Sequence, residues 1–378
     1  MIPLAVPNLR GNEKKYVDHC IETEFVSSVG AYVTQMEEMC REACGADDAV
    51  ATSSGTTGLH AMLYAFGVRR DDIVILPTFT FIASANAVAH CGAEPWLFDI
   101  DENWVLDATA VEEALQTACR VTGEGTVIHT ATGRRVAAIM PVYTLGNIPD
   151  MNRFRKIADK YRLPLLADAA CAVGATFENR PIGALSDAAV LSFNGNKTIT
   201  CGGGGMVIGN DKERMKLIRH ITTTARVGIE YDFDMVGFNY RMTNVQAAIG
   251  CAQMEQLDTF IKRKKAVHRF YETHISGTGD IAHFPVTDGG TCWYSGIVFR
   301  DGGIEKVRKT CANLKERGVE SRTFWKPVHL QTPYVNAPRQ QLTRAEQIWE
   351  NIVSLPCSTC ITDDELETVA AAVNDLCG

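Results

Sequence analysis

Two stretches decide the fold: LPLLADAA (residues 163–170) and AAVLSFNGNK (residues 188–197). Each begins with a short apolar run and ends in polar residues, Asp168 in the first stretch and Ser192 and Lys197 in the second. Continuous apolar runs indicate strands that are covered on both faces, as in a parallel or mostly parallel sheet. In such sheets, ligands bind in the loops where the strands end.

The same alternation of strands and helices extends in both directions from these stretches. Further apolar runs lie at residues 73–76, 137–142 and 206–208, and residues 57–66 and 151–161 have the apolar spacing of helices. We therefore predict a large α/β domain over residues 1–250, with a mostly parallel sheet covered by helices.

The C-terminal third has a different pattern. We predict a long helix over residues 244–272, then short strands, and a closing helix that begins at the capping box of residues 362–365. This pattern indicates a smaller α/β domain over residues 251–378.

Composition excludes several classes of function. The 378 residues carry a formal charge of −8, which argues against nucleic-acid or anionic-membrane partners, because both require a basic surface. No 18 apolar residues run together and the first residues do not resemble an export signal, so we expect a cytoplasmic protein. The thirteen cysteines are scattered, and Cys357 and Cys360 lack a second pair, so we assign no metal site.

Three polar strand ends carry the candidate chemistry. Ser54, Gly55 and Thr56 lie at the start of a predicted helix, where free N–H groups and the positive helix end suit a phosphate. Asp168 ends a buried strand, and a carboxylate there needs a cation or several donors. Lys197 lies between glycine-rich segments, with space for a bulky group on its amine. Taken singly, each also fits a simpler interpretation: a helix cap, a capping aspartate and an exposed loop lysine.

The order of these three signals is more informative than any one of them. Together they supply one group for each part of pyridoxal phosphate (PLP): the phosphate, the ring nitrogen and the aldehyde.

These motifs resemble the DegT-type nucleotide-sugar aminotransferases, which have the aspartate-aminotransferase fold (PLP fold type I). The resemblance covers nearly the whole chain. It implies that Gly55, Thr56 and Ser192 bind the cofactor phosphate, that Asp168 pairs with the ring nitrogen, and that Lys197 carries the cofactor as a Schiff base. In the PTFTF segment at residues 77–81, it implies that Phe81 stacks on the pyridine ring.

Later motifs bear on the partner subunit and the substrate. The segment GFNYRM at residues 237–242 resembles the family pattern in which the asparagine, here Asn239, reaches the cofactor of the partner subunit, which implies a homodimer. Ser28, Arg241 and His329 are the implied substrate contacts. For His329, a structural role in the core is an equal alternative.

The chain departs from the family pattern near the cofactor. Cys171 stands where many relatives have glutamine, Asn194 where many have histidine, and Gly203 where glutamate is common. We still place Cys171 and Asn194 among the cofactor contacts. The segment EFVSS at residues 24–28 resembles a branch that aminates 4-keto-6-deoxy-2-acetamido nucleotide sugars on the route to legionaminic-type sugars.

The resemblance implies transfer of an amino group from glutamate to the C4 ketone of a nucleotide-linked sugar. Two alternatives stay open. A PLP-dependent sugar dehydratase of this family would have histidine in place of Lys197. A cofactor-binding regulator without turnover would need a further binding module, which neither the length nor the charge indicates.

Overall fold

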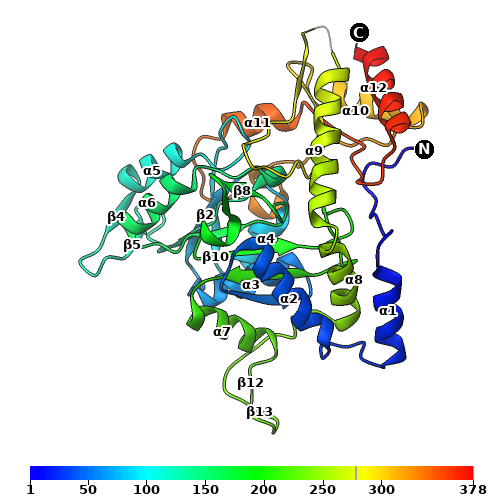
Figure 1. Ribbon diagram of the computed structural model, residues 1–378. Helices are drawn as coiled ribbons and strands as arrows, with labels where there is room; N and C mark the ends of the chain where they lie inside the picture. The colour runs from blue at the N-terminus through cyan, green and yellow to red at the C-terminus, as the bar shows by residue number, and fades with distance from the viewer. Residues whose placement is uncertain (277–278, 378) are drawn as a thin grey trace.

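A mostly parallel sheet forms the centre of the molecule in the computed structural model, which describes residues 1–276 and 279–377 (Figure 1). One part has the strand order β1-β11-β10-β7 and the other β3-β2-β6. Parallel bridges, Ile139 to Leu165 and Val142 to Asp168, join β6 to β7 and make the sheet continuous. Within the described chain, β11 alone runs against its neighbours in this sheet. The strands are β1 (Asp48–Thr52), β2 (Ile73–Pro77), β3 (Glu94–Phe98), β6 (Val136–Ile139), β7 (Leu166–Asp168), β10 (Ala188–Ser192) and β11 (Gly205–Gly209).

The helices predicted over residues 57–66 and 151–161 are confirmed as α3 and α6, and the closing helix is confirmed as α12. Three of them, α3, α8 and α12, begin at a reciprocal capping box. None that the structure describes is long and apolar enough to cross a membrane. The helices are α1 (Glu13–Glu22), α2 (Ala31–Cys44), α3 (Gly55–Ala65), α4 (Ile82–His90), α5 (Ala108–Thr117), α6 (Met151–Tyr161), α7 (Lys212–Thr222), α8 (Asn244–Met254), α9 (Leu257–His274), α10 (Gly303–Glu316), α11 (Thr343–Trp349) and α12 (Asp363–Cys377).

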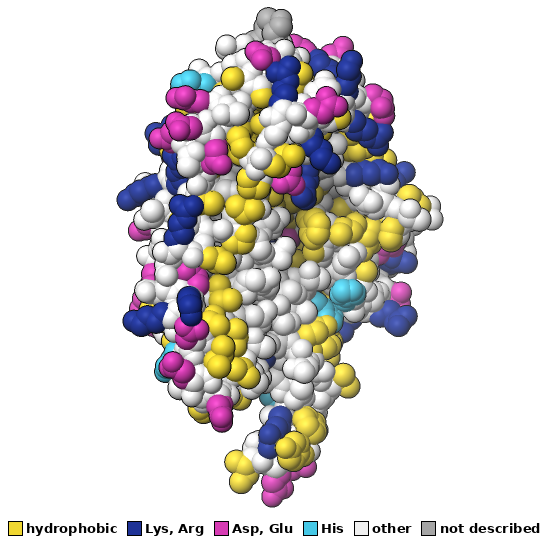
Figure 2. Space-filling model, turned by 90° about the vertical axis from the view of Figure 1, so that its right-hand side faces the viewer, with side chains coloured by type: hydrophobic (Ala, Val, Ile, Leu, Met, Phe, Trp, Pro, Cys, Tyr) yellow, Lys and Arg dark blue, Asp and Glu magenta, His cyan; other side chains and the backbone are white. Residues whose placement is uncertain are grey.

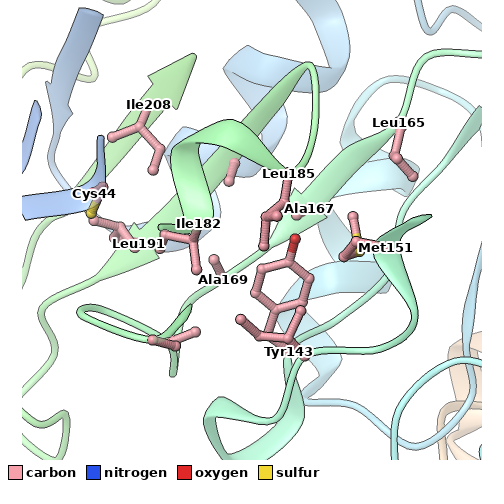
Figure 3. Packing of buried hydrophobic residues seen from close by; sticks show 14 of the residues in the cluster. Cys44, Tyr143, Met151, Leu165, Ala167, Ala169, Ile182, Leu185, Leu191 and Ile208 are labelled. Atoms are coloured by element: carbon pink, nitrogen blue, oxygen red, sulfur yellow. The ribbon is translucent and has the colours of Figure 1, made fainter. Parts of the chain in front are cut away.

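The central strands β7 and β10 lie in the apolar core between the segments that cover the sheet. Ala167 of β7 and Leu191 of β10 are fully buried and belong to one apolar cluster with Tyr143 and Met151 (Figure 3). Burial on both faces explains why these strands have continuous apolar sequences. The packing holds the polar ends of β7 and β10 at one edge of the sheet.

The C-terminal part has its own sheet and core. Strands β14 (Ile281–His283), β15 (Ser295–Phe299) and β16 (Ile352–Leu355) form an antiparallel sheet. Strand β15 packs against α9 and β16 against α10, and α12 packs against both helices. The N-terminus joins this part, since the Ile2 N–H donates to Gly318 O at 2.7 Å. The shorter pairs of strands are β4 (Cys119–Val121) with β5 (Val127–His129), β8 (Thr176–Phe177) with β9 (Arg180–Pro181), and β12 (Arg226–Val227) with β13 (Asp232–Phe233).

One helix prediction was wrong in detail. The helix expected over residues 244–272 is two helices, because the chain leaves helical geometry at Gln256. The preceding residue, Glu255, bonds to Asn12 Nδ2 at 2.7 Å and Tyr16 OH at 2.5 Å. The apolar stripe continues through both helices, so the sequence pattern does not indicate the break. The predicted boundary near residue 250 stays a prediction.

Candidate active site

The three strand ends meet at one cavity of about 220 Å³. The turn after β1, the end of β7 and the loop after β10 each contribute to its lining. A larger hollow of about 900 Å³ beside α6 contains none of the strand-end residues. Eight of the predicted site residues line the smaller cavity, namely Gly55, Thr56, Phe81, Asp168, Cys171, Ser192, Asn194 and Lys197.

The turn after β1 is built to receive an anion. Ser54 Oγ accepts from the Thr57 N–H at 3.1 Å, and Thr57 Oγ1 accepts from the Ser54 N–H at 3.0 Å. The N–H groups of Gly55 and Thr56, the first two residues of α3, have no acceptor inside the helix. A Cβ on Gly55 would lie 3.0 Å from Ser192 Cβ, so glycine keeps the turn close to β10. This turn fits the phosphate of PLP.

Asp168 is a buried carboxylate at the end of β7, only 4% exposed. Ser84 Oγ donates to its Oδ2 at 2.7 Å and the Ala170 N–H to its Oδ1 at 3.1 Å. Burial raises the pKa of Asp168, and the bond from Ser84 opposes that rise. Among the described residues no Lys or Arg forms an ion pair with it. A protonated ring nitrogen facing Asp168 would supply the missing cation, so this site fits the ring of PLP.

Lys197 extends from the loop after β10 into the same cavity. Its Nζ donates to Cys171 Sγ at 3.2 Å and lies 3.8 Å from the centre of the Trp293 ring. Burial raises the pKa of the Cys171 thiol, and the positive charge of Lys197 opposes that rise. The amine is therefore inside the cavity and beside a thiol that burial keeps uncharged.

Aromatic side chains border the cavity near its polar groups. The Phe81 ring is 56% exposed although it lines the cavity, and its centre lies 6.3 Å from that of Trp325. The exposed face is free to stack on a planar ligand. Asn194 is exposed and donates to Asn196 Oδ1 at 3.4 Å.

Four predicted residues do not line this cavity. Ser28 and Asn239 are exposed on loops. Arg241 forms an ion pair with Glu37. His329 is buried, with Nδ1 2.7 Å from Thr78 Oγ1 and Nε2 3.0 Å from Glu346 Oε1, which favours the structural alternative for this histidine. Their substrate and partner roles stay predictions.

The sequence reasoning missed three lining or supporting residues: Ser84, Trp293 and Trp325. Ser84 lies in the first turn of α4, whereas Thr80 precedes that helix, and their hydroxyl oxygens are 2.8 Å apart. That spacing is a weak signal. Trp293 and Trp325 come from the C-terminal third and reach the cavity through tertiary packing alone.

The segment that carries Asn239 packs against a buried histidine of α3. His60 Nδ1 lies 3.2 Å from Tyr240 OH, and the His60 ring lies 4.8 Å from that of Phe238. Burial, and then the neighbouring His90, lower the pKa of His60 to about 4. The pKa of His60 in the folded chain is below its ordinary value of 6.5, so the unfolded chain takes up a proton first as the pH falls. The contribution of His60 to the free energy of unfolding is therefore fully present above pH 6.5 and is lost between pH 6.5 and about 4.

We therefore expect the melting temperature of the native chain to fall as the pH is lowered through this window. The melting temperature of His60→Gln should fall by a smaller amount. Thermal unfolding followed by circular dichroism between pH 4 and 7.5 measures the effect, with His274→Gln on the exposed end of α9 as the matched control. Equal slopes for native protein and His60→Gln would assign the acid sensitivity to other groups.

Comparison with known proteins identifies the family. The model of the DegT/DnrJ/EryC1/StrS aminotransferase family matches residues 7–374. The chain belongs to this family. It is a PLP-dependent sugar aminotransferase, so the predicted family, fold class, enzyme class and cofactor are confirmed.

Relatives of this aminotransferase match over its whole length. It is 36% identical to the GDP-perosamine synthase of Caulobacter vibrioides over 99% of this chain and 98% of the relative. The GDP-perosamine synthase of Escherichia coli O157:H7 is 32% identical, with the same coverage. Among solved structures, the aminotransferase TlmJ of Streptoalloteichus hindustanus superimposes with a TM-score of 0.88 at 25% identity, over 100% of this chain and 98% of TlmJ.

Proposed function

We propose that this aminotransferase moves an amino group from glutamate to the C4 ketone of a nucleotide-linked 4-keto-6-deoxyhexose. The whole-length similarity to two GDP-perosamine synthases carries the proposal, because perosamine is a 4-amino sugar. The same similarity favours GDP as the nucleotide.

Each part of the cavity has a proposed role in holding the cofactor. The N–H groups of Gly55 and Thr56, with the hydroxyl of Ser192, bind the phosphate. Asp168 holds a proton on the ring nitrogen, and Phe81 stacks on the ring. When bound, PLP supplies an electron sink for the bond-breaking step.

Lys197 has two proposed tasks in turn. Its amine first holds the cofactor covalently, and glutamate then displaces it. The freed Nζ is already inside the cavity, so it could take the proton from glutamate Cα as a general base and would deliver it, as a general acid, to C4′ of bound PLP. The same amine reverses these steps on the keto sugar.

The three proposed substrate contacts differ in whether their side chains already have partners within the chain. Ser28 is exposed and free to bind a ligand. Arg241 and His329 already have partners within the chain, Glu37 for the first and Thr78 and Glu346 for the second, so a substrate would have to share or exchange these bonds.

We also propose that two copies build each active site, with Asn239 reaching the neighbour's cofactor phosphate. The hairpin of β12 and β13 projects from one end of the molecule and carries hydrophobic side chains (Figures 1 and 2). Ile229 is 93% exposed and Val236 is 80% exposed. Exposed apolar groups of this kind mark association surfaces. Asn239 lies a short distance beyond this hairpin in the chain, after residues 234–238, and is itself exposed.

A complementation experiment tests the shared site. Asn239→Ala should weaken cofactor binding by about 1.5–3 kcal/mol, the value of one hydrogen bond to a charged group. Hybrids of Asn239→Ala with Lys197→Ala, co-expressed with different tags, should recover tight binding at one site per dimer. That site combines Lys197 from one chain with Asn239 from the other. No recovery in purified hybrids would place Asn239 in its own chain's site.

The substrate proposal is tested with a panel of 4-keto nucleotide sugars analysed by mass spectrometry. We expect turnover of the GDP-linked 4-keto-6-deoxyhexose with a mass change that corresponds to replacement of the ketone oxygen by an amine. The second candidate is a 2-acetamido sugar, favoured by the segment at residues 24–28. Preferential turnover of the acetamido compound would replace the first candidate, and no turnover of any 4-keto sugar would contradict both.

A further inference from the structure

The amine of Lys197 lies between the side chains of Cys171 and Trp293, 3.2 Å from Cys171 Sγ and 3.8 Å from the centre of the indole ring. We propose that Cys171 and Trp293 form an amine seat, which holds Lys197 Nζ near the reacting atoms while it is not attached to the cofactor. This inference rests on the proposed role of Lys197.

The two contacts suit an amine that must be held and then released. A lysine side chain has four flexible carbons, so a free amine explores many positions unless contacts restrict it. Because burial raises the pKa of the Cys171 thiol, its contact with Lys197 is a hydrogen bond to an uncharged group. The face of the Trp293 ring attracts the positive end of the side chain without bonding it. Neither contact ties the amine as firmly as a carboxylate would.

The backbone around Trp293 fixes both halves of the amine seat. Thr291 Oγ1 donates to Cys171 O at 3.0 Å, and Trp293 Nε1 donates to Asn196 O at 2.7 Å. Between them, Cys292 is buried with a φ of 53°, a left-handed conformation that is rare outside glycine. Surrounding contacts must hold such a residue in place, and strain of this kind clusters at functional sites.

A buried lysine holds Trp293 from the other side. Lys264 of α9 is 3% exposed, and its Nζ donates to Trp293 O at 2.8 Å and Cys357 O at 2.7 Å. The backbone of Trp293 also donates from its N–H to Leu145 O at 3.0 Å. The indole is therefore fixed before any ligand binds, and Lys264 acts as a positioning residue through Trp293.

The alternative is that Trp293 is only a wall of the cavity. Trp325 offers a matched control, because it lines the same cavity and its ring centre lies 5.9 Å from that of Trp293. Among the described residues, Trp325 forms neither a hydrogen bond nor a cation–π contact with Lys197. If Trp293 only lines the cavity, substitution of either tryptophan should have similar effects. If Trp293 is part of the amine seat, only its substitution should affect Lys197.

Nuclear magnetic resonance of the cofactor-free protein tests the seat without any turnover. Lysines are converted to ¹³C-dimethyl-lysines, and loss of one signal in Lys197→Ala assigns Lys197. We expect this signal upfield of the other lysines, because protons above an aromatic face are shielded. Trp293→Leu should return it to the common position and Trp325→Leu should not. A Lys197 signal among the other lysines in the native chain would overturn the proposal, even if Trp293→Leu failed to fold.

The second readout follows proton transfer. With glutamate deuterated at Cα, Trp293→Leu and Cys171→Ala should slow the glutamate half-reaction about tenfold, part of the 10²–10⁴-fold that a positioned base contributes. Their isotope effect should exceed that of the native chain. Trp325→Leu should keep the native isotope effect. An unchanged isotope effect in both Trp293→Leu and Cys171→Ala would contradict the proposal. If the native chain does not react with glutamate, that result would instead contradict glutamate as the proposed amino donor.

Discussion

Replacing Lys197 by alanine should abolish amino transfer and leave the fold intact. The side chain extends from a loop into the cavity, and its one described hydrogen bond goes to Cys171, so its loss removes little packing. Loss of a positioned proton carrier alone costs about 10²–10⁴-fold in rate, and loss of the covalent attachment adds to this. Product formation with glutamate and a 4-keto nucleotide sugar measures the effect.

The matched control for this variant is Lys262→Ala, which removes an exposed lysine of α9. Both variants should melt within a few degrees of the native chain. Residual activity of Lys197→Ala well above a trace, without added amine, would assign the proton transfers to another group.

Asp168→Asn should lower turnover by about 10²-fold or more while the cofactor still binds. The neutral amide cannot stabilise a protonated ring nitrogen, and preorganised charges of this kind are worth about 10²–10³-fold. The amide also fits its surroundings, because Ser84 can accept from Nδ2 and pass its own hydrogen to Thr80 Oγ1, 2.8 Å away. A native rate in Asp168→Asn would show that the carboxylate only caps β7.

In the cofactor-free protein, Asp168→Asn should raise the thermal stability, although the same substitution lowers turnover. Burial raises the pKa of Asp168 above the ordinary value of 3.8, so the protonated acid suits the fold. Stability from this group is fully present below pH 3.8 and is lost as the pH rises through the folded value. Asp168→Asn does not titrate, so its melting temperature should gain on the native chain as the pH rises. With PLP bound at neutral pH, the native chain should instead melt at a higher temperature than Asp168→Asn.

Much of the fold could be predicted because each central strand carries its own signal. The runs ending in Asp168 and Ser192 are continuous and apolar because both faces of β7 and β10 are buried. The start of α3 was equally visible, since Ser54 and Thr57 are cap residues whose partners lie within four positions. The break between α8 and α9 was not visible, because its contacts come from the N-terminal residues.

Site residues at the ends of strands could be predicted from the sequence. Site residues that only tertiary packing brings to the cavity could not. Asp168 ends β7 and Lys197 lies in the loop after β10, and ligands bind where the strands of such a sheet end. Ser84 and Trp293 lie 84 and 96 positions from the residues that they contact, and nothing in their local sequence indicates those contacts. Arg241 has an aromatic, polar neighbourhood typical of a site, yet its described partner is Glu37 in the same chain.

One absorbance measurement tests the central claim, that this chain carries an amino group from glutamate to a 4-keto nucleotide sugar through Lys197. The PLP-loaded protein is mixed with glutamate, the excess is removed, and the keto sugar is then added. We predict that the visible band of the bound cofactor bleaches with glutamate and returns with the sugar, and that Lys197→Ala shows neither change. A band that glutamate leaves unaltered, or one that no 4-keto nucleotide sugar restores, would contradict the claim.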